Sequence, residues 1–203
     1  MTTVLLQTTY FGPVQWYQKL HRYDHVLIEQ YDSYQNQTYP NRCIIATANG
    51  RQSLTVPMEH NSQFVKDLRI SDHNQWRRIH WNALQSAYSE SPFFEYYADD
   101  IRPFFEQKYD FLIDFNEAIR QKMCEHIDIH PHVEYTQAFL PPQHPSPQTL
   151  DLRSVISAKH PQPDADFESK PYWQVFQQKH GFQPNLSILD LLFNQGPESI
   201  FYL

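Results

Sequence analysis

The sequence predicts one α/β domain with a mostly parallel sheet, and the order of its first elements carries this prediction. An apolar run at residues 4–6 is followed by an amphipathic segment at 14–23 and by a second apolar run at 25–29. In the middle segment, apolar residues recur every three to four positions, which is typical of a helix with one buried face. The chain therefore opens with a β-α-β unit. Its 203 residues fit a single domain, residues 1–203, with several covering helices.

The clearest local signal is the dipeptide Asn49-Gly50, which lies between two stretches rich in β-forming residues. Both residues accept the positive φ of a type I′ turn, so a β-hairpin is expected over about residues 42–57. Periodicity and capping residues indicate the remaining elements. They are a short strand at 66–70, a helix at about 71–89, a helix from 93, a long helical segment at 104–127, a strand at 133–140, a short helix at 173–179 and a helix at 188–193.

Residues 141–170 differ in composition from the rest of the chain. Six prolines lie in this segment, with Ser, Gln, His and Asp between them. Such a segment is typical of a long loop or of a lid over a site. A short strand or turn is expected within it, around residues 150–153.

Composition limits the classes of partner. The formal net charge of −7 argues against a general affinity for nucleic acid or for an anionic membrane. Only 4 glycines are present, so no Gly-rich phosphate loop of the P-loop or dinucleotide type can be written. A small-molecule substrate is the expected partner. The sequence identifies no cofactor and does not indicate the oligomeric state.

The cysteines and the N-terminus favour a cytoplasmic protein. The first residues lack the charged and apolar regions of a signal peptide, and no apolar run approaches the length of a membrane span. Cys43 and Cys124 lie far apart in unlike contexts. We expect both to be reduced thiols in the core rather than partners in a disulfide.

The carboxyl end of the first strand is the favoured substrate site. Gln7, Tyr10 and Phe11 place amide, hydroxyl and aromatic groups just past this strand, where open α/β sheets bind ligands. Two further tyrosines, Tyr17 on the following helix and Tyr88 on a later one, complete the aromatic part of the expected substrate-binding set.

Polar residues beyond the second strand extend this candidate site. Glu29 and Asp32, at the end of the second strand, can hold an amine, a ribose or a metal ion, although a solvated turn explains them equally well. Asn41 and Arg42 enter the hairpin, where an arginine beside a cleft would form a bidentate clamp for an anion. The competing interpretation of Arg42 is an exposed arginine on an edge strand.

His80 is the candidate general base. It lies within a helix on an aromatic stripe, one turn after Trp76, although a half-buried structural histidine fits the same pattern. Other histidines form pairs at helical spacing, such as His21 with His25 and His126 with His130. These pairs span expected helix ends and lack the context of a zinc motif, so no metal site is predicted.

Several motifs occur in the order found in a known family. They are Gln7, Tyr10-Phe11-Gly12-Pro13, Tyr17, Asp24, Tyr39-Pro40-Asn41-Arg42-Cys43-Ile44, Asn49-Gly50, Leu54-Thr55-Val56-Pro57, Trp76, His80, Tyr88, Ser91-Pro92-Phe93-Phe94 and Leu186-Ser187-Ile188-Leu189-Asp190-Leu191-Leu192-Phe193-Asn194. Across nearly its whole length the chain resembles the WbqC-like family. Thr8 and Gly12 depart from the family pattern, which usually has Pro at the first position and often at the second.

The resemblance implies a role in bacterial surface-polysaccharide (O-antigen-type) biosynthesis, where glycyl or aminoacyl transfer onto an amino sugar has been suggested for the family. It supplies no established catalytic residues. The leading hypothesis is a transferase that acts on a nucleotide-linked or otherwise activated sugar, with His80 and Asp32 as catalytic groups and Arg42 binding phosphate or carboxylate. The alternatives are a non-catalytic sugar- or nucleotide-binding module and a nucleotidyl transfer enzyme.

Overall fold

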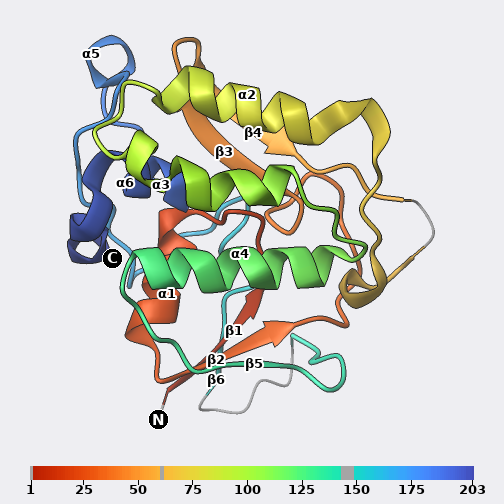
Figure 1. Ribbon diagram of the computed structural model, residues 1–203. Coiled ribbons are helices and arrows are strands. Elements are labelled where there is room, and N and C mark those ends of the chain that lie inside the picture. Colours follow the sequence, from red (N-terminus) through yellow and green to blue (C-terminus); the bar gives the residue numbers. More distant parts are fainter. Residues whose placement is uncertain (1, 60–61, 143–148) are drawn as a thin grey trace.

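A four-stranded parallel sheet lies at the base of the molecule, in the strand order β5-β2-β1-β6 (Figure 1). The structure is a computed structural model that describes residues 2–59, 62–142 and 149–203. The strands are β1 (Thr3–Gln7), β2 (His25–Glu29), β5 (Val133–Tyr135) and β6 (Thr149–Asp151). Strands β1 and β2 pair in parallel on either side of helix α1 (Val14–Arg22) in the chain. The α/β class and its β-α-β opening are therefore confirmed.

The hairpin forms a separate two-stranded antiparallel sheet of β3 (Arg42–Thr47) and β4 (Gly50–Thr55). The hairpin prediction is confirmed, but the predicted turn type was wrong. Thr47 pairs with Gly50, so Ala48 and Asn49 form the turn, and of Asn49 and Gly50 only Gly50 has a positive φ, of 98°. The Thr47 hydroxyl accepts a hydrogen bond from the Asn49 N–H and donates one to the Gly50 carbonyl, which stabilises this alternative turn.

Helices cover the sheets. In Figure 1, helices α2, α3 and α4 cross the view in successive rows with the parallel sheet below them. Helix α2 contacts β3, and α6 contacts both α1 and α3. The α-helices after α1 are α2 (Trp76–Tyr88), α3 (Phe94–Ile101), α4 (Leu112–His126), α5 (Gln177–His180) and α6 (Ile188–Gln195). Short 3-10 helices are η1 (Val65–Asp67), η2 (His73–Gln75), η3 (Arg102–Phe105) and η4 (Gly196–Tyr202).

Two expected strands differ from the structure. Residues 65–67 form η1, and Arg69 and Ile70 make only isolated bridges, to Phe111 and Met58. The strand expected at 133–140 ends at Tyr135. The Thr136 N–H still bonds to the Ile28 carbonyl of β2, and farther along the Leu140 N–H bonds to the carboxylate of Glu29.

The Pro-rich segment is only partly a loop. Residues 149–151 form β6, which pairs with β1, and residues 143–148 lie outside the described part of the chain. Farther along, Asp164 forms an ion pair of 2.7 Å with the buried Lys19 of α1 and accepts a hydrogen bond from Gln15. This part of the segment is thereby attached to α1.

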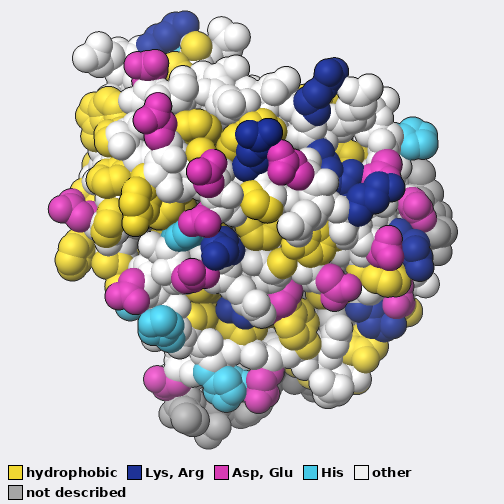
Figure 2. Space-filling view, viewed as in Figure 1, with side chains coloured by type: hydrophobic (Ala, Val, Ile, Leu, Met, Phe, Trp, Pro, Cys, Tyr) yellow, Lys and Arg dark blue, Asp and Glu magenta, His cyan; other side chains and the backbone are white. Residues whose placement is uncertain are grey.

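Both cysteines are free and buried, so the prediction of two core thiols is confirmed. Among the described residues, no helix is both long and apolar enough to cross a bilayer. On the face shown in Figure 2, Lys and Arg side chains are scattered among Asp and Glu rather than gathered in one stripe.

Candidate functional site

A cavity of about 690 Å³ lies at the carboxyl ends of three strands of the parallel sheet. Gln7 ends β1, Asp151 ends β6, and Asp32 follows β2 by three residues; all three line the cavity. Parallel strands end at the same edge of a sheet, which explains why residues so far apart in sequence meet here. Other polar side chains on its walls are Gln35, Thr38, Ser154, Ser157, His160 and Gln162.

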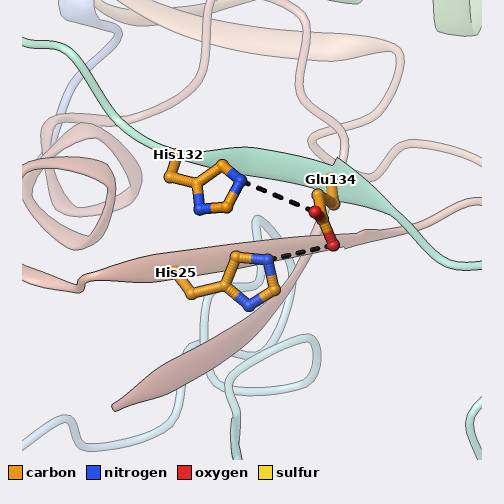
Figure 3. Close-up of side chains that lie close together, drawn as sticks. All are labelled: His25, His132 and Glu134. Carbon is orange, nitrogen blue, oxygen red and sulfur yellow. Dashed lines mark ion pairs between the residues drawn. The ribbon is translucent and has the colours of Figure 1, made fainter. Parts of the chain in front are cut away.

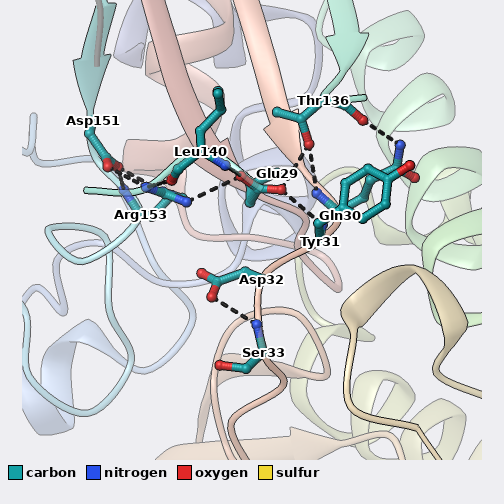
Figure 4. A network of polar contacts seen from close by, with 9 residues as sticks. All are labelled: Glu29, Gln30, Tyr31, Asp32, Ser33, Thr136, Leu140, Asp151 and Arg153. Atoms are coloured by element: carbon teal, nitrogen blue, oxygen red, sulfur yellow. Dashed lines mark hydrogen bonds and ion pairs between the residues drawn. The ribbon is translucent and has the colours of Figure 1, made fainter. Parts of the chain in front are cut away.

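A buried ion-pair network forms the floor of this region (Figure 4). The Arg153 side chain is only 5% exposed and donates to both carboxylate oxygens of Asp151, at 3.0 and 2.6 Å. It also donates to Glu29 Oε2 at 3.3 Å and to the Leu140 carbonyl at 2.7 Å. This arrangement uses the planar fork of arginine donors, so the guanidinium is fixed in one orientation.

Glu29 is equally fixed. Its fully buried carboxylate accepts hydrogen bonds from the N–H groups of Tyr31 and Leu140 and from the Thr136 hydroxyl, as well as from Arg153. Buried charges are tolerated when they are paired and hydrogen-bonded in this way. Glu29 therefore joins β2, the residues after β5 and the residues after β6 at one point behind the cavity.

Asp32 differs from Glu29 because it lies on the cavity wall with few partners. Its Oδ1 accepts a hydrogen bond of 2.8 Å from the Ser33 N–H, and Oδ2 has no hydrogen-bond partner in the described ranges of the chain. Burial raises the pKa of Asp32, and the Ser33 hydrogen bond and the Arg153 charge oppose this shift. A carboxylate with a raised pKa and a free oxygen can accept a proton or bind an amine.

The charges around the cavity favour a cationic or hydroxyl-rich group over a polyphosphate. Glu29, Asp32 and Asp151 carry three negative charges and Arg153 one positive charge, which leaves two negative charges when His160 is neutral. Arg153 cannot serve as a free bidentate clamp for an anion, because four of the five N–H donors of a guanidinium are occupied within the protein. An amine or sugar hydroxyls match this environment.

Two aromatic rings complete the walls. Phe139 is 44% exposed, and the Arg153 guanidinium lies 5.7 Å from its ring centroid. Tyr39 is buried, and this burial raises the pKa of its hydroxyl to about 12. An exposed ring beside polar groups can stack on the apolar face of a sugar or a base.

Of the residues expected from the sequence, Gln7 and Asp32 lie on the cavity walls. Tyr10 and His80 lie together elsewhere, in the aromatic core. The Tyr10 hydroxyl is 2.9 Å from Nδ1 of His80, and the two side chains are buried against Trp76, Phe105 and Phe115. Burial lowers the pKa of His80 to about 4. His80 is thus a neutral core histidine in this structure, the structural alternative that the sequence also allowed.

Phe11, Tyr17 and Tyr88 are also fully buried. Phe11 has a φ of 40° in the corner between β1 and α1, and its ring packs on Phe105. The Tyr88 hydroxyl donates to the buried carboxylate of Asp190 at 2.9 Å. These three side chains pack in the core and are not among the residues that line the cavity.

Asn41 and Arg42 bond within the hairpin region. The Asn41 side chain donates to the Val56 carbonyl at 2.9 Å, and Arg42 Nε donates to the Thr55 hydroxyl at 3.0 Å. Neither is among the residues that line the cavity. The structure therefore does not bring Arg42 or His80 to the cavity that holds Gln7 and Asp32.

Arg153 and Asp151, which form an ion pair at the cavity, were not among the site residues expected from the sequence. Asp151 and Arg153 lie in the short stretch expected as a strand or turn around 150–153, and His160 lies in the Pro-rich segment. An alternating Leu-Asp-Leu-Arg pattern at 150–153 was the available signal. This pattern indicates a position at the cavity only when β6 is known to pair with β1.

The fold and the cavity define a class of protein: an α/β domain with a polar ligand-sized cavity at the carboxyl edge of a parallel sheet. Comparison with known proteins then gives the family. The chain matches the WbqC-like protein family over residues 7–161 and 165–202, and it belongs to this family.

One curated relative is the uncharacterized protein Rv1507c of Mycobacterium tuberculosis. It is 26% identical over 202 residues, which cover 89% of this chain and 87% of the relative. No solved structure matches the chain significantly. The family is therefore established, and these comparisons name no reaction.

Proposed function

We propose that this protein is a transferase of surface-polysaccharide biosynthesis that acylates the amine of an activated amino sugar with an amino acid such as glycine, or with a similar small acid. The observation that carries this proposal is Asp32, a half-buried carboxylate of raised pKa on the wall of a net-negative cavity. The sugar ring would occupy the cavity. Its activating phosphate or nucleotide would lie toward the open side, away from Glu29 and Asp151.

The proposed step balances as a simple acyl transfer. The neutral amine attacks the carbonyl carbon of an activated acyl donor, a C–N bond forms, and the bond to the leaving group breaks. The amine proton passes to Asp32. An ordinary exposed carboxylate is a weak base for this step, and the raised pKa brings Asp32 closer to the required range. In this assignment Asp32 replaces His80 as base because His80 is enclosed in the core.

Residues that line the cavity would also make the contacts with the substrate. Gln7, Thr38 and Ser154 offer amide and hydroxyl groups for sugar hydroxyls, and Phe139 offers an exposed ring for stacking. Residues 152–162 form one side of the cavity and would act as the water-excluding lid. The free thiols Cys43 and Cys124 fit the expected cytoplasmic location.

A non-catalytic sugar- or nucleotide-binding module is the second candidate, supported by the four hydrogen bonds that hold Arg153 within the protein and by the buried position of His80. Nucleotidyl transfer is less well supported, because a triphosphate would meet the net negative charge of the cavity.

The test combines binding with product detection. The protein is screened by thermal shift against nucleotide-linked amino sugars, then incubated with the stabilising sugar and activated amino acids, and the product is followed by mass spectrometry. For the transferase, we expect product formation to fall about 100-fold or more in Asp32→Asn while sugar binding is kept. Asp99→Asn, an exposed aspartate on α3, is the matched control and should behave as wild type.

The remaining outcomes separate the hypotheses. Stabilisation by a sugar without any product favours the binding module. Stabilisation by nucleoside triphosphates alone would favour nucleotidyl transfer. If Asp32→Asn retains full activity, the role of Asp32 is wrong.

A further inference from the structure

Three potential metal ligands lie on one face of the sheet at its β2–β5 edge, away from the cavity. Val26 pairs with Val133 in the parallel register, and the Val26 N–H bonds to the His132 carbonyl at 2.9 Å. His25 and His132 each precede one member of this pair, and Glu134 lies two residues after His132. Because side chains alternate between faces along a strand, all three project to the same side.

The ligand atoms of these residues converge (Figure 3). His25 Nε2 lies 3.1 Å from Glu134 Oε2, and His132 Nε2 lies 3.5 Å from Glu134 Oε1. The two imidazole centroids are 4.8 Å apart, and the three ligand atoms all lie within 4.8 Å of one another. Ligands of a tetrahedral zinc ion, at about 2.0–2.2 Å from the metal, are separated by roughly 3.3 Å. Only small side-chain rotations are therefore needed to centre an ion.

We propose that His25, His132 and Glu134 bind a divalent zinc-class cation. Two imidazoles and one carboxylate are a ligand set that suits zinc, and they leave a fourth position for water. The nitrogen of His25 that faces away from Glu134, Nδ1, lies 3.5 Å from the Thr3 hydroxyl. A partner on that nitrogen holds the other nitrogen toward the ion, as is usual for metal-binding histidines.

The exposure of the cluster suits reversible binding. The His132 and Glu134 side chains are 65% and 57% exposed, so an ion can enter without opening the fold, and the His25 side chain is 21% exposed and holds its position. The cation would cross-link the edge strand β5 to β2. Along β2, His25 lies about 13 Å from Glu29 at the cavity end, so this site is independent of the proposed transferase.

Helical spacing in the sequence could not indicate this site. It pairs His25 with His21 and His130 with His126, whereas the structure brings His25 to His132 and Glu134, at the start of β5 and more than a hundred residues later in the chain.

The test measures zinc binding to the full chain. Wild-type protein, His132→Ala and Glu134→Gln are each titrated with Zn²⁺ by isothermal calorimetry, and bound zinc is counted by elemental mass spectrometry after desalting. His130→Ala and Glu168→Gln are matched controls, because both residues are exposed and lie outside the cluster. We expect one zinc per wild-type chain, and affinity at least about tenfold weaker in both cluster variants but unchanged in both controls.

Acidification provides a second readout, because an imidazole binds a metal ion only in its neutral form and zinc affinity should therefore fall as the pH is lowered. Glu134→Gln retains a side chain of equal size on an exposed position, so it tests the ligand without threatening the fold. Equal zinc affinity in wild type, His132→Ala and Glu134→Gln would mean an adventitious ion only and would overturn the proposal. So would the absence of measurable zinc binding to the wild type.

Discussion

At the scale of single residues, burial decides the protonation of His80. The imidazole is enclosed by aromatic rings and paired with the Tyr10 hydroxyl, and desolvation lowers its pKa to about 4 from a usual 6.5. A hydrogen bond with the Thr55 backbone acts in the opposite direction but does not cancel the effect. The folded protein therefore holds this histidine neutral at pH values where the unfolded chain protonates it.

This difference predicts acid destabilisation. Between about pH 6.5 and pH 4 the unfolded state binds a proton at position 80 that the folded state does not, so stability falls as pH falls through this window. The expected loss from this residue is about 3 kcal/mol. Urea unfolding at pH 7 and pH 4 measures it, and His80→Gln should show a smaller pH dependence by about that amount. An unchanged dependence in the variant would contradict a neutral buried His80.

Arg153 is the second residue whose buried contacts predict a large effect of substitution on stability. Replacing it with Met leaves Glu29 buried without its cationic partner, and removing one member of a buried pair costs about 3–5 kcal/mol. Urea unfolding of Arg153→Met should show this loss. Arg78→Met, at an exposed position on α2, should stay within about 0.5 kcal/mol of wild type. Equal stability of the two variants would show that the network is dispensable.

Of the site residues expected from the sequence, some line the cavity and others lie in the core, for a physical reason. Gln7 and Asp32 follow strands that can be read locally, so their position at the sheet edge could be predicted. Whether an aromatic or histidine side chain points into a cavity or into the core depends on distant packing partners. For Tyr10 and His80 these partners come from α4 and η3, which periodicity does not reveal.

At the scale of elements, residues 186–188 join three parts of the fold. The Val14 N–H bonds to the Leu186 carbonyl, the Ser187 N–H to Ile44 of β3, and the Ile188 N–H to Gly12. Within the corner itself, Gly12 leaves room for the side chain of Thr9, because an added Cβ would lie 2.4 Å from the Thr9 hydroxyl oxygen. The start of α6 is thereby fixed to the corner between β1 and α1 and to the hairpin.

Ser187 is the cap at this junction. Its hydroxyl oxygen accepts a hydrogen bond from the Leu189 N–H at the start of α6, and the hydroxyl donates to the Phe11 carbonyl at 2.8 Å. Ser187→Ala removes both bonds in a buried position and should cost about 1–2 kcal/mol, or roughly 2–8 °C in Tm. Thermal unfolding measures the change. Ser86→Ala, exposed on α2, is the control, and a similar Tm for both variants would argue against the capping role.

The elements that could be predicted are those specified by local sequence. The β1-α1-β2 opening and α6 have clear periodicity and matched the structure closely. Strand β6 pairs with β1 from more than 140 positions away, and the three-residue strands β5 and β6 are too short for alternation to identify them or their order. Sheet order therefore required the three-dimensional structure.

At the scale of the whole molecule, the segment after β6 links the cavity to helix α1. Residues 152–162 line the cavity, and the following residues are held on α1. Lys19 of α1 is completely buried and forms its ion pair with Asp164, while Gln18 and Arg22 donate to the Asp166 carbonyl. The position of one cavity wall thus depends on contacts that the following residues make with α1.

The Lys19–Asp164 pair should therefore control how often this wall opens. In Asp164→Asn the buried ammonium loses its carboxylate partner, and breaking such a pair costs about 3–5 kcal/mol. If the cost is relieved by local opening, amide hydrogen exchange in residues 152–166 should accelerate by about 100-fold, with little change in the β1–β2 core. Hydrogen exchange followed by mass spectrometry measures this. In Asp166→Asn the backbone carbonyl contacts remain, so its exchange should match wild type, and equal acceleration in both variants would show that the ion pair does not hold the wall.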